Sequence, residues 1–269
     1  MEYELSVHHY ICGPETPFPE FAGMVRDAGI GSVAVTRAAL VEMGVPALGR
    51  CLKDHGLGVS SLSSAGYLTG TQPQSKAGFS DSEMIDIAAE LGAVNLTVIS
   101  AGAGDPSKPF AEAYELVVAG LAEMAAEAAA KGVILGVEPI HPNHILARGC
   151  INTIAHAQKI IAPHASARLL LDLNHSWWDP DFPGVMREAP ETVAVIQMCN
   201  LKFENGYAVG RETLAAGDLD MARLIGAMTA GGFRGPFEFE LFPGDLRGRD
   251  LPSLINGYAE EFAACVAAA

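Results

Sequence analysis

Four side chains capable of metal binding or proton transfer stand at the ends of apolar segments in this chain. Glu138 ends the apolar run 133–137, and Asp172 closes a second apolar segment. Gln197 is the first polar side chain after a third segment, and Glu240 lies near the end of a fourth. Burying a carboxylate beside apolar residues is costly unless a cation or another partner compensates its charge. We therefore expect these four side chains to converge on one divalent metal ion.

The donor atoms indicate which metal this would be. Three carboxylates and one amide form an all-oxygen set, which suits Mn²⁺, Mg²⁺ or Ca²⁺ better than Zn²⁺. Mn²⁺ is the first choice because catalysis requires open coordination positions, and Mg²⁺ or Co²⁺ is the alternative. The same carboxylates have a second interpretation, in which one or two of them pair with Arg148 or Arg211.

The last of these segments, residues 237–241, carries two glutamates. Because side chains alternate along a strand, Glu238 and Glu240 share one face and the phenylalanines lie on the other. Glu240 is nearer the C-terminal end and is the better ligand. Glu238 is expected one layer lower, where its replacement affects stability more than turnover.

Short apolar segments alternate with helix-like segments along the chain. This pattern predicts the strands and helices that bring these side chains together. We expect eight strands, at residues 5–10, 32–35, 59–62, 94–100, 133–138, 168–172, 193–199 and 237–241, with helices between them. Residues 63–78, rich in Gly, Ser, Thr and Gln, are expected to form a functional loop. Eight such units without a linker predict an α/β protein, a single (β/α)8 TIM barrel forming one domain over residues 1–269. In such barrels the active site lies at the C-terminal strand ends.

The composition limits the partners and the compartment. The chain has 17 Lys and Arg against 32 Asp and Glu, a net charge of −15, which disfavours nucleic acid and anionic membranes as partners. We expect no transmembrane helix, because no apolar run approaches about 18 residues. Five cysteines without a Cys-x-x-Cys pair, and an N-terminus without a basic start, favour a reduced, cytoplasmic protein. The expected partner is a small carbohydrate-like molecule.

The motifs around these residues resemble those of the xylose isomerase-like TIM barrel superfamily, the sugar phosphate isomerase/epimerase group. Glu138 and the Pro-Ile-His-Pro after it resemble the Glu-Pro-Leu-His-Pro element of that group. Asp172 opens a segment that resembles the Asp-x-x-His-x-Trp-Trp-Asp-Pro element, and residues 237–242 resemble the closing Glu-x-Glu strand. The resemblance covers most of the chain and is strongest from residue 133 to residue 242.

The resemblance implies both a metal site and a reaction. Glu138, Asp172 and Glu240 would bind the metal, and the two glutamates would also exchange the proton next to the substrate carbonyl through an enediolate. On the seventh strand the family usually has a His ligand in a His-x-x-Asp element, where this chain has Gln197 and Asn200. Hydroxypyruvate isomerase-like relatives use Gln there, so Gln197 is the expected fourth ligand and Asn200 the alternative.

Further residues are expected to contact a substrate. His175 and Arg211 match substrate contacts of the family, and His141 belongs to the same motif as Glu138. Trp178, with its neighbour Trp177, would shield the cavity from water or stack on a sugar. His8 would face the cavity from the first strand. Each of these five has a structural interpretation as well, as a packing or loop residue.

Three functions are compatible with these features. The first is a metal-dependent isomerase or epimerase of a small sugar, keto-polyol or hydroxy-ketone. The second is a lyase or dehydratase that abstracts the same proton from a keto-cyclitol or 3-keto-glycoside. The third is a non-catalytic sugar-binding homologue, which the altered seventh strand favours. An apurinic-site endonuclease is disfavoured by the acidic composition, and the resemblance also implies a possible homodimer.

Overall fold

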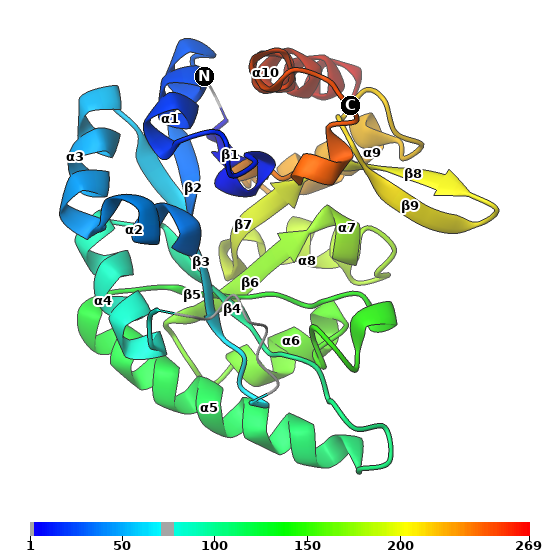
Figure 1. Cartoon of the computed structure of the whole chain (residues 1–269). Coiled ribbons are helices and arrows are strands. Elements are labelled where there is room, and N and C mark those ends of the chain that lie inside the picture. Colours follow the sequence, from blue (N-terminus) through cyan, green and yellow to red (C-terminus); the bar gives the residue numbers. More distant parts are fainter. Residues whose placement is uncertain (1–2, 71–77) are drawn as a thin grey trace.

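Eight parallel strands close into a barrel (Figure 1). The computed structural model describes residues 3–70 and 78–269. Around the barrel each strand pairs with its neighbours in the order β1-β10-β7-β6-β5-β4-β3-β2, so the predicted TIM barrel is confirmed. The barrel strands are β1 (Leu5–His8), β2 (Ser32–Thr36), β3 (Gly58–Gly66), β4 (Asn95–Ile99), β5 (Leu135–Val137), β6 (Ala167–Asp172), β7 (Val193–Met198) and β10 (Phe237–Phe239).

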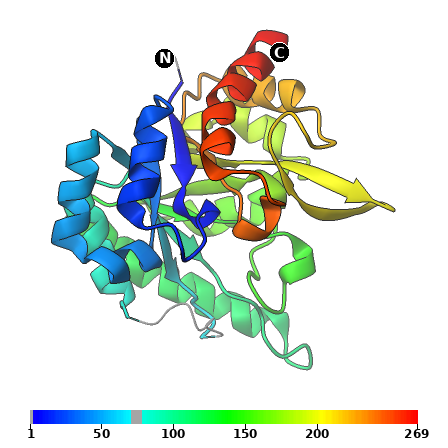
Figure 2. The same cartoon turned by 45° about the horizontal axis from the view of Figure 1, so that its top comes forward.

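Helices surround the barrel on its outside (Figure 2). The α-helices are α1 (Phe18–Asp27), α2 (Arg37–Met43), α3 (Val45–His55), α4 (Asp81–Leu91), α5 (Phe110–Lys131), α6 (Ile154–Ile161), α7 (Leu173–Ser176), α8 (Phe182–Glu188), α9 (Met221–Ala230) and α10 (Leu251–Ala268). Short 3-10 helices are η1 (His9–Ile11), η3 (Pro142–His144), η4 (Pro190–Thr192) and η5 (Pro243–Asp245). None of the helices in the described ranges has the length and apolarity needed to cross a membrane.

Aromatic packing joins the last strand to the last helix. The rings of Phe239 and Tyr258 stack with centroids 4.6 Å apart, and the Tyr258 hydroxyl donates a 2.9 Å hydrogen bond to the Phe237 carbonyl. Both partners are buried. Because a buried tyrosine hydroxyl needs an acceptor, this bond fixes α10 against the strand that precedes Glu240.

Local signals in the sequence account for where the long helices begin and end. Ser80 and Glu83 form a capping box at the start of α4, with the Ser80 hydroxyl accepting from the Glu83 N–H and the Glu83 carboxylate accepting from the Ser80 N–H. Gly132 ends α5 with φ of 70°, the left-handed conformation that favours glycine. These caps determine where the helices begin and end between the strands.

Several strands differ in length from the prediction. β1 ends at His8 instead of residue 10, because His9–Ile11 form η1. β3 continues to Gly66 instead of ending at Leu62, because its buried serines give no apolar pattern. Residues 63–66 of the predicted loop therefore belong to a strand, and residues 71–77 lie outside the described residues. β5 and β10 are shorter than expected, so Glu138 and Glu240 stand just beyond their strands.

A hairpin that the sequence analysis missed follows β7. β8 (Asn200–Glu204) and β9 (Tyr207–Glu212) pair antiparallel, outside the barrel. Asn205 and Gly206 connect them with φ of 50° and 83°. An Asn-Gly pair between two extended segments is a strong hairpin signal, and it was available in the sequence. The hairpin turns the chain back so that β9 ends at the top of the barrel.

Asn200 anchors the base of this hairpin. Its amide nitrogen donates to the carbonyls of Leu214 and Leu219, and its amide oxygen accepts from the N–H groups of Leu201 and Leu219. Gly217 passes so close that a Cβ there would lie 2.2 Å from the Asn200 side-chain carbon. Asn200 is thus fully used in holding residues 214–219 against the hairpin.

Replacing Asn200 should therefore cost stability. Asn200→Ala removes two donors and one acceptor that serve buried backbone groups, and we expect it to lower the free energy of unfolding by roughly 2–4 kcal/mol. Urea denaturation followed by circular dichroism measures this change. Asn205→Ala, at the exposed turn of the same hairpin, is the control and should cost less. Equal losses for the two variants would show that Asn200 is not the anchor.

Candidate active site

A cavity of about 330 Å³ lies at the C-terminal ends of the barrel strands. Five of the predicted site residues line it, namely Glu138, Asp172, Gln197, Arg211 and Glu240. The three carboxylates and the amide are buried. The convergence expected from the strand ends is thus present in the fold.

Backbone pairing brings these four side chains to the same end of the barrel. Asp172 of β6 lies opposite Gln197 of β7 in the strand register. Glu240 and Glu138 follow β10 and β5, and their N–H groups donate to the carbonyls of Met198 and Val98 at 3.0 and 3.2 Å. These hydrogen bonds continue the sheet pattern for one more residue, so the barrel fixes the backbone of both glutamates.

Arg211, from β9, enters the cavity between two carboxylates. Its Nη2 donates to Asp172 Oδ2 at 2.7 Å and to Glu240 Oε2 at 3.0 Å. The guanidinium lies 4.7 Å from the centre of the Phe242 ring. Its Nε is buried and has no hydrogen-bond partner among the described residues. The pairing of carboxylates with Arg211 is therefore present, as the second interpretation of the sequence expected.

Arg211 gives the carboxylates different protonation behaviour. Burial acts to raise the pKa of Asp172, but Arg211, His175 and the Asn174 N–H outweigh it, and the pKa lies below its ordinary value. Burial, followed by the charge of Asp172, raises the pKa of Glu138 to about 8. Burial also raises the pKa of Glu240, although Arg211 opposes the shift. One aspartate with a lowered pKa therefore stands beside two glutamates whose pKa values are raised.

His175, on α7, faces two of these carboxylates. Its Nε2 lies 3.7 Å from Glu138 Oε1 and 3.6 Å from Asp172 Oδ2, and it has no hydrogen-bond partner among the described residues. Burial lowers the pKa of His175 to about 4, so the imidazole is neutral at pH 7. The Trp178 indole N–H donates to the His175 carbonyl at 2.8 Å, which helps to fix α7.

Glu138, Asp172 and His175 fit a divalent cation. Each offers one ligand atom, and the three atoms lie within 4.8 Å of one another. A neutral imidazole with an unpartnered ring nitrogen beside two carboxylates is a donor set that transition metals accept. Sequence reasoning assigned His175 to the substrate alone. Its spacing of three residues from Asp172, within one helical turn, was the signal for this second role.

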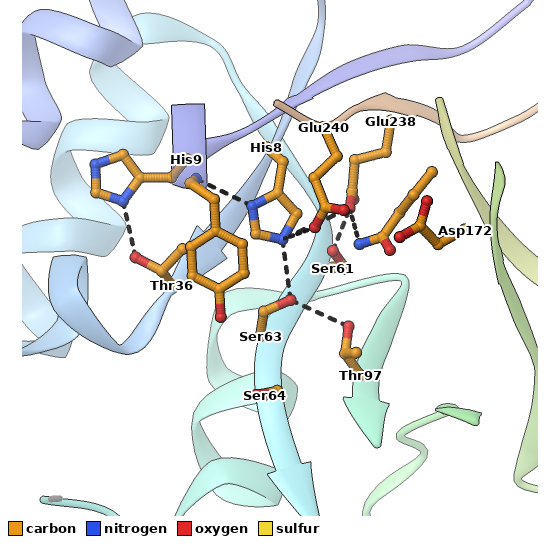
Figure 3. A network of polar contacts seen from close by, with 12 residues as sticks. His8, His9, Thr36, Ser61, Ser63, Ser64, Thr97, Asp172, Glu238 and Glu240 are labelled. Atoms are coloured by element: carbon orange, nitrogen blue, oxygen red, sulfur yellow. Dashed lines mark hydrogen bonds and ion pairs between the residues drawn. The ribbon is translucent and has the colours of Figure 1, made fainter. Parts of the chain in front are cut away.

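A polar layer around Glu238 lies beneath the cavity (Figure 3). Gln197 Nε2 donates to Glu238 Oε1 at 2.9 Å, and the hydroxyls of Ser60 and Ser61 each donate to Glu238 Oε2 at 2.6 Å. Because the Gln197 nitrogen is used below, its amide oxygen remains available to the cavity that Gln197 lines. Asn200 does not line this cavity, since it serves the hairpin.

His8 lies at the edge of the same layer. Its Nε2 is 3.1 Å from Ser63 Oγ, 3.7 Å from Glu240 Oε1 and 3.8 Å from Glu238 Oε1. The His8 ring stacks on Tyr10 with centroids 4.3 Å apart, and it is fully buried. His8 therefore supports Glu240 from below, while Tyr10 forms the cavity wall in front of it.

Four of the five predicted substrate residues do not line this cavity, and Arg211 is the exception. His8 and His175 approach its carboxylates from outside the lining. His141 and Trp178 pack edge to face with each other, with ring centroids 5.5 Å apart.

Six residues that the sequence analysis did not assign to the site also line the cavity: Tyr10, Ser63, Ser64, Tyr67, Thr97 and Phe242. Arg148, which the sequence analysis considered as a partner of the carboxylates, lines it too. Tyr10, Tyr67 and Phe242 follow strand ends, and the strand-end rule applied to all eight strands would have found Tyr10 and Phe242.

Comparison with known proteins places this fold and these motifs in one family. The model of the xylose isomerase-like TIM barrel family matches residues 23–262. The chain belongs to that family. The resemblance of its motifs to this group is thereby confirmed. A comparison with curated proteins found no match for this xylose isomerase-like chain.

Solved structures show the same barrel over nearly the whole chain. A protein from Sinorhizobium meliloti 1021 is 26% identical, with a TM-score of 0.87 and coverage of 98% of this chain and 99% of that one. The apo 3-keto-D-glucoside 4-epimerase from E. coli is 16% identical, with a TM-score of 0.75 and 98% of each chain covered. The IOLI protein, solved with a zinc atom bound, is 14% identical, with a TM-score of 0.75 and 98% of each chain covered. The last two similarities establish the fold alone.

The raised pKa of Glu138 predicts how the metal-free protein responds to pH. Between the ordinary carboxyl pKa of 4.5 and about 8, the folded chain keeps a proton that the unfolded chain has lost. The unfolded state then binds fewer protons, so stability falls as pH rises through this interval. Thermal unfolding in EDTA from pH 5 to pH 9 measures this, and Glu138→Gln should flatten the dependence. An unchanged slope in that variant would refute the assignment.

Proposed function

We propose that this chain is a divalent-metal-dependent isomerase or epimerase acting on a small sugar, keto-polyol or hydroxy-ketone. The observation that supports this most directly is the arrangement of Glu138 and Glu240. Both are buried carboxyls with raised pKa values, and they line one cavity beside the ionised Asp172. Two carboxyl groups with raised pKa values that face one cavity suit proton exchange next to a carbonyl.

The proposed metal ligands are Glu138, Asp172, Gln197 and Glu240, to which the geometry adds His175. Mn²⁺ remains the first choice. When bound, a divalent cation would polarise the substrate carbonyl and stabilise negative charge on its oxygen. Asp172 is held ionised by Arg211 and is therefore ready to bind a cation without first losing a proton.

Proton transfer is assigned to the two glutamates. Glu138 and Glu240 stand at the ends of β5 and β10, which are separated by β6 and β7 in the barrel. A substrate between them would present one face or one carbon to each carboxylate. One glutamate takes the proton next to the carbonyl, and the other returns a proton elsewhere or on the opposite face. Burial of both keeps water from competing for these protons.

Arg211 supplies a polar contact for the substrate, and His175 Nε2 serves the cation or, when no cation is bound, the substrate. Arg211 Nε and His175 Nε2 are buried and have no partner in the described part of the chain. Buried polar groups without partners carry a free-energy cost that a bound molecule can relieve. A hydroxyl or carbonyl oxygen of the substrate is a suitable acceptor for Arg211, and these contacts would orient it between the glutamates.

Protonation of the proposed ligands makes metal binding depend on pH. Carboxylates bind a cation only after losing their protons, and the pKa of Glu138 is raised to about 8. We expect Mn²⁺ to raise the melting temperature more at pH 8.5 than at pH 6. Differential scanning fluorimetry of EDTA-treated protein, with Ca²⁺ for comparison, measures the shift. No stabilisation by any divalent cation at either pH would argue for a non-catalytic homologue.

Substitutions of the three glutamates distinguish a role in catalysis from a role in stability. Glu138→Gln and Glu240→Gln should each reduce kcat/KM by about 10²–10⁴-fold, because each removes an acid/base group. Glu238→Gln is the matched control, one layer lower. It should keep turnover within about tenfold while lowering the free energy of unfolding by roughly 1–3 kcal/mol, because its new amide donor faces three existing donors.

The assay is a panel of aldoses, ketoses and keto-glycosides with products analysed by mass spectrometry. A product of unchanged mass identifies an isomerase or epimerase, whereas loss of water or of an aglycone identifies the lyase alternative. Full activity in Glu138→Gln or Glu240→Gln would contradict the proposed roles.

A further inference from the structure

A second cavity of about 340 Å³ lies beside the active site. Three segments form it: η3, the α7 region and the β8–β9 hairpin. We call it the rim cavity, and define it by His141, His144, Asn174, Trp177, Phe203 and Tyr207. Two of these residues come from the sequence motifs around Glu138 and Asp172, yet they lie outside the active-site cavity.

His175 contacts residues of both cavities. Its Nδ1 is 3.2 Å from the Nδ2 atom of Asn174, which lines the rim cavity. Its Nε2 is 3.7 Å from Glu138 and 3.6 Å from Asp172, which line the active-site cavity. His144, another rim residue, packs its ring edge to face with His175, with centroids 5.9 Å apart.

The same backbone segment also lines both cavities. Ala147 and Arg148 contribute to the active-site cavity, and His141, Asn143 and His144 contribute to the rim cavity. Residues 141–148 therefore form a common wall. A molecule that extends from one cavity along this wall would meet both sets of side chains.

The side chains of the rim cavity suit an uncharged ligand rich in hydroxyl groups. Trp177 and Phe203 meet edge to face with centroids 5.3 Å apart, and Tyr207 is 73% exposed. Asn143 and Asn174 offer amide donors and acceptors, and no Asp, Glu, Lys or Arg of the described residues lines this cavity.

The imidazoles of the rim cavity add polar ring nitrogens. His141 and His144 both line it and can donate or accept hydrogen bonds. Aromatic faces bind the C–H faces of a sugar ring, while amides and neutral imidazoles bind its hydroxyls. A charged ligand would find no counter-ion here.

We propose that the rim cavity binds an uncharged sugar ring, the second unit of a substrate whose reacting unit occupies the active-site cavity. This rests on the proposed function and narrows it, because it makes the substrate a glycoside or disaccharide and not a free monosaccharide. It also gives Trp177 and His141 a common role in contacting that second ring.

Tryptophan fluorescence offers a direct test. The chain has only two tryptophans, and Trp177 lines the rim cavity. EDTA-treated protein is titrated with cellobiose, maltose, D-glucose and D-glucuronate, so that the measurement needs neither metal nor turnover. We expect a saturable change with at least one disaccharide, at lower concentration than with D-glucose or D-glucuronate. Tyr207→Ala should weaken this binding about three- to tenfold, the effect of one aromatic contact.

Val209→Ala is the matched control. Val209 lies on the same strand, is 48% exposed and does not line the rim cavity, so its truncation should leave the affinity unchanged. The proposal is overturned by the absence of a saturable response to any disaccharide, or by equal effects of the two substitutions.

The two proposals fail separately. If no sugar is turned over but the disaccharide response and its dependence on Tyr207 persist, the rim cavity stands and the proposed reaction falls. If monosaccharides are isomerised while disaccharides give no response, the reaction stands and the second subsite is wrong.

Discussion

A guanidinium held between two buried carboxylates determines the electrostatics at the centre of this barrel. Arg211 pairs with Asp172 and Glu240, which belong to the ends of β6 and β10. Removing one partner from such a buried group leaves an uncompensated charge, which is far more costly than losing an exposed ion pair. The position of Arg211 is therefore critical. The β8–β9 hairpin, which Asn200 anchors, carries Arg211 to this position. Asp245 adds to this support, because its carboxylate accepts from the N–H groups of both Arg211 and Phe242.

The same pairing divides the acidic residues by function. Asp172 stays ionised because Arg211 compensates its burial, whereas Glu138 pairs with no Lys or Arg of the described residues and keeps its proton to higher pH. Glu238 lies one layer below Glu240 on the same face, is satisfied by two serine hydroxyls and the Gln197 amide, and does not line the cavity. Two positions on one face, one inside β10 and one just beyond it, thus separate a structural carboxylate from one that lines the cavity.

Much of this could be predicted from the sequence, because it depends on local patterns. Alternating strands and helices predict the barrel, and polar residues at the ends of apolar runs predict which side chains meet. What the sequence does not reveal is how side chains pair across the barrel. Arg211 and Asp172 are 39 residues apart, and only the hairpin brings them together. β3 was predicted too short because its serines face a polar interior, where the usual apolar signal is absent. The division of the motif residues between two cavities likewise depends on how η3 and α7 pack.

The β8–β9 hairpin has an implication for how such a protein diversifies. Its base is fixed by Asn200 and carries Arg211 into the active site, while its tip carries Asn205, Gly206 and the exposed Tyr207 at the rim. The two ends are linked by antiparallel pairing with a register shift between Lys202 and Phe203, so the tip can change in length or sequence without moving the base. Exchange of the tip is thus a route by which relatives could acquire different ligand preferences while the catalytic machinery is inherited unaltered. For a protein engineer, it marks residues 204–208 as the segment to randomise first.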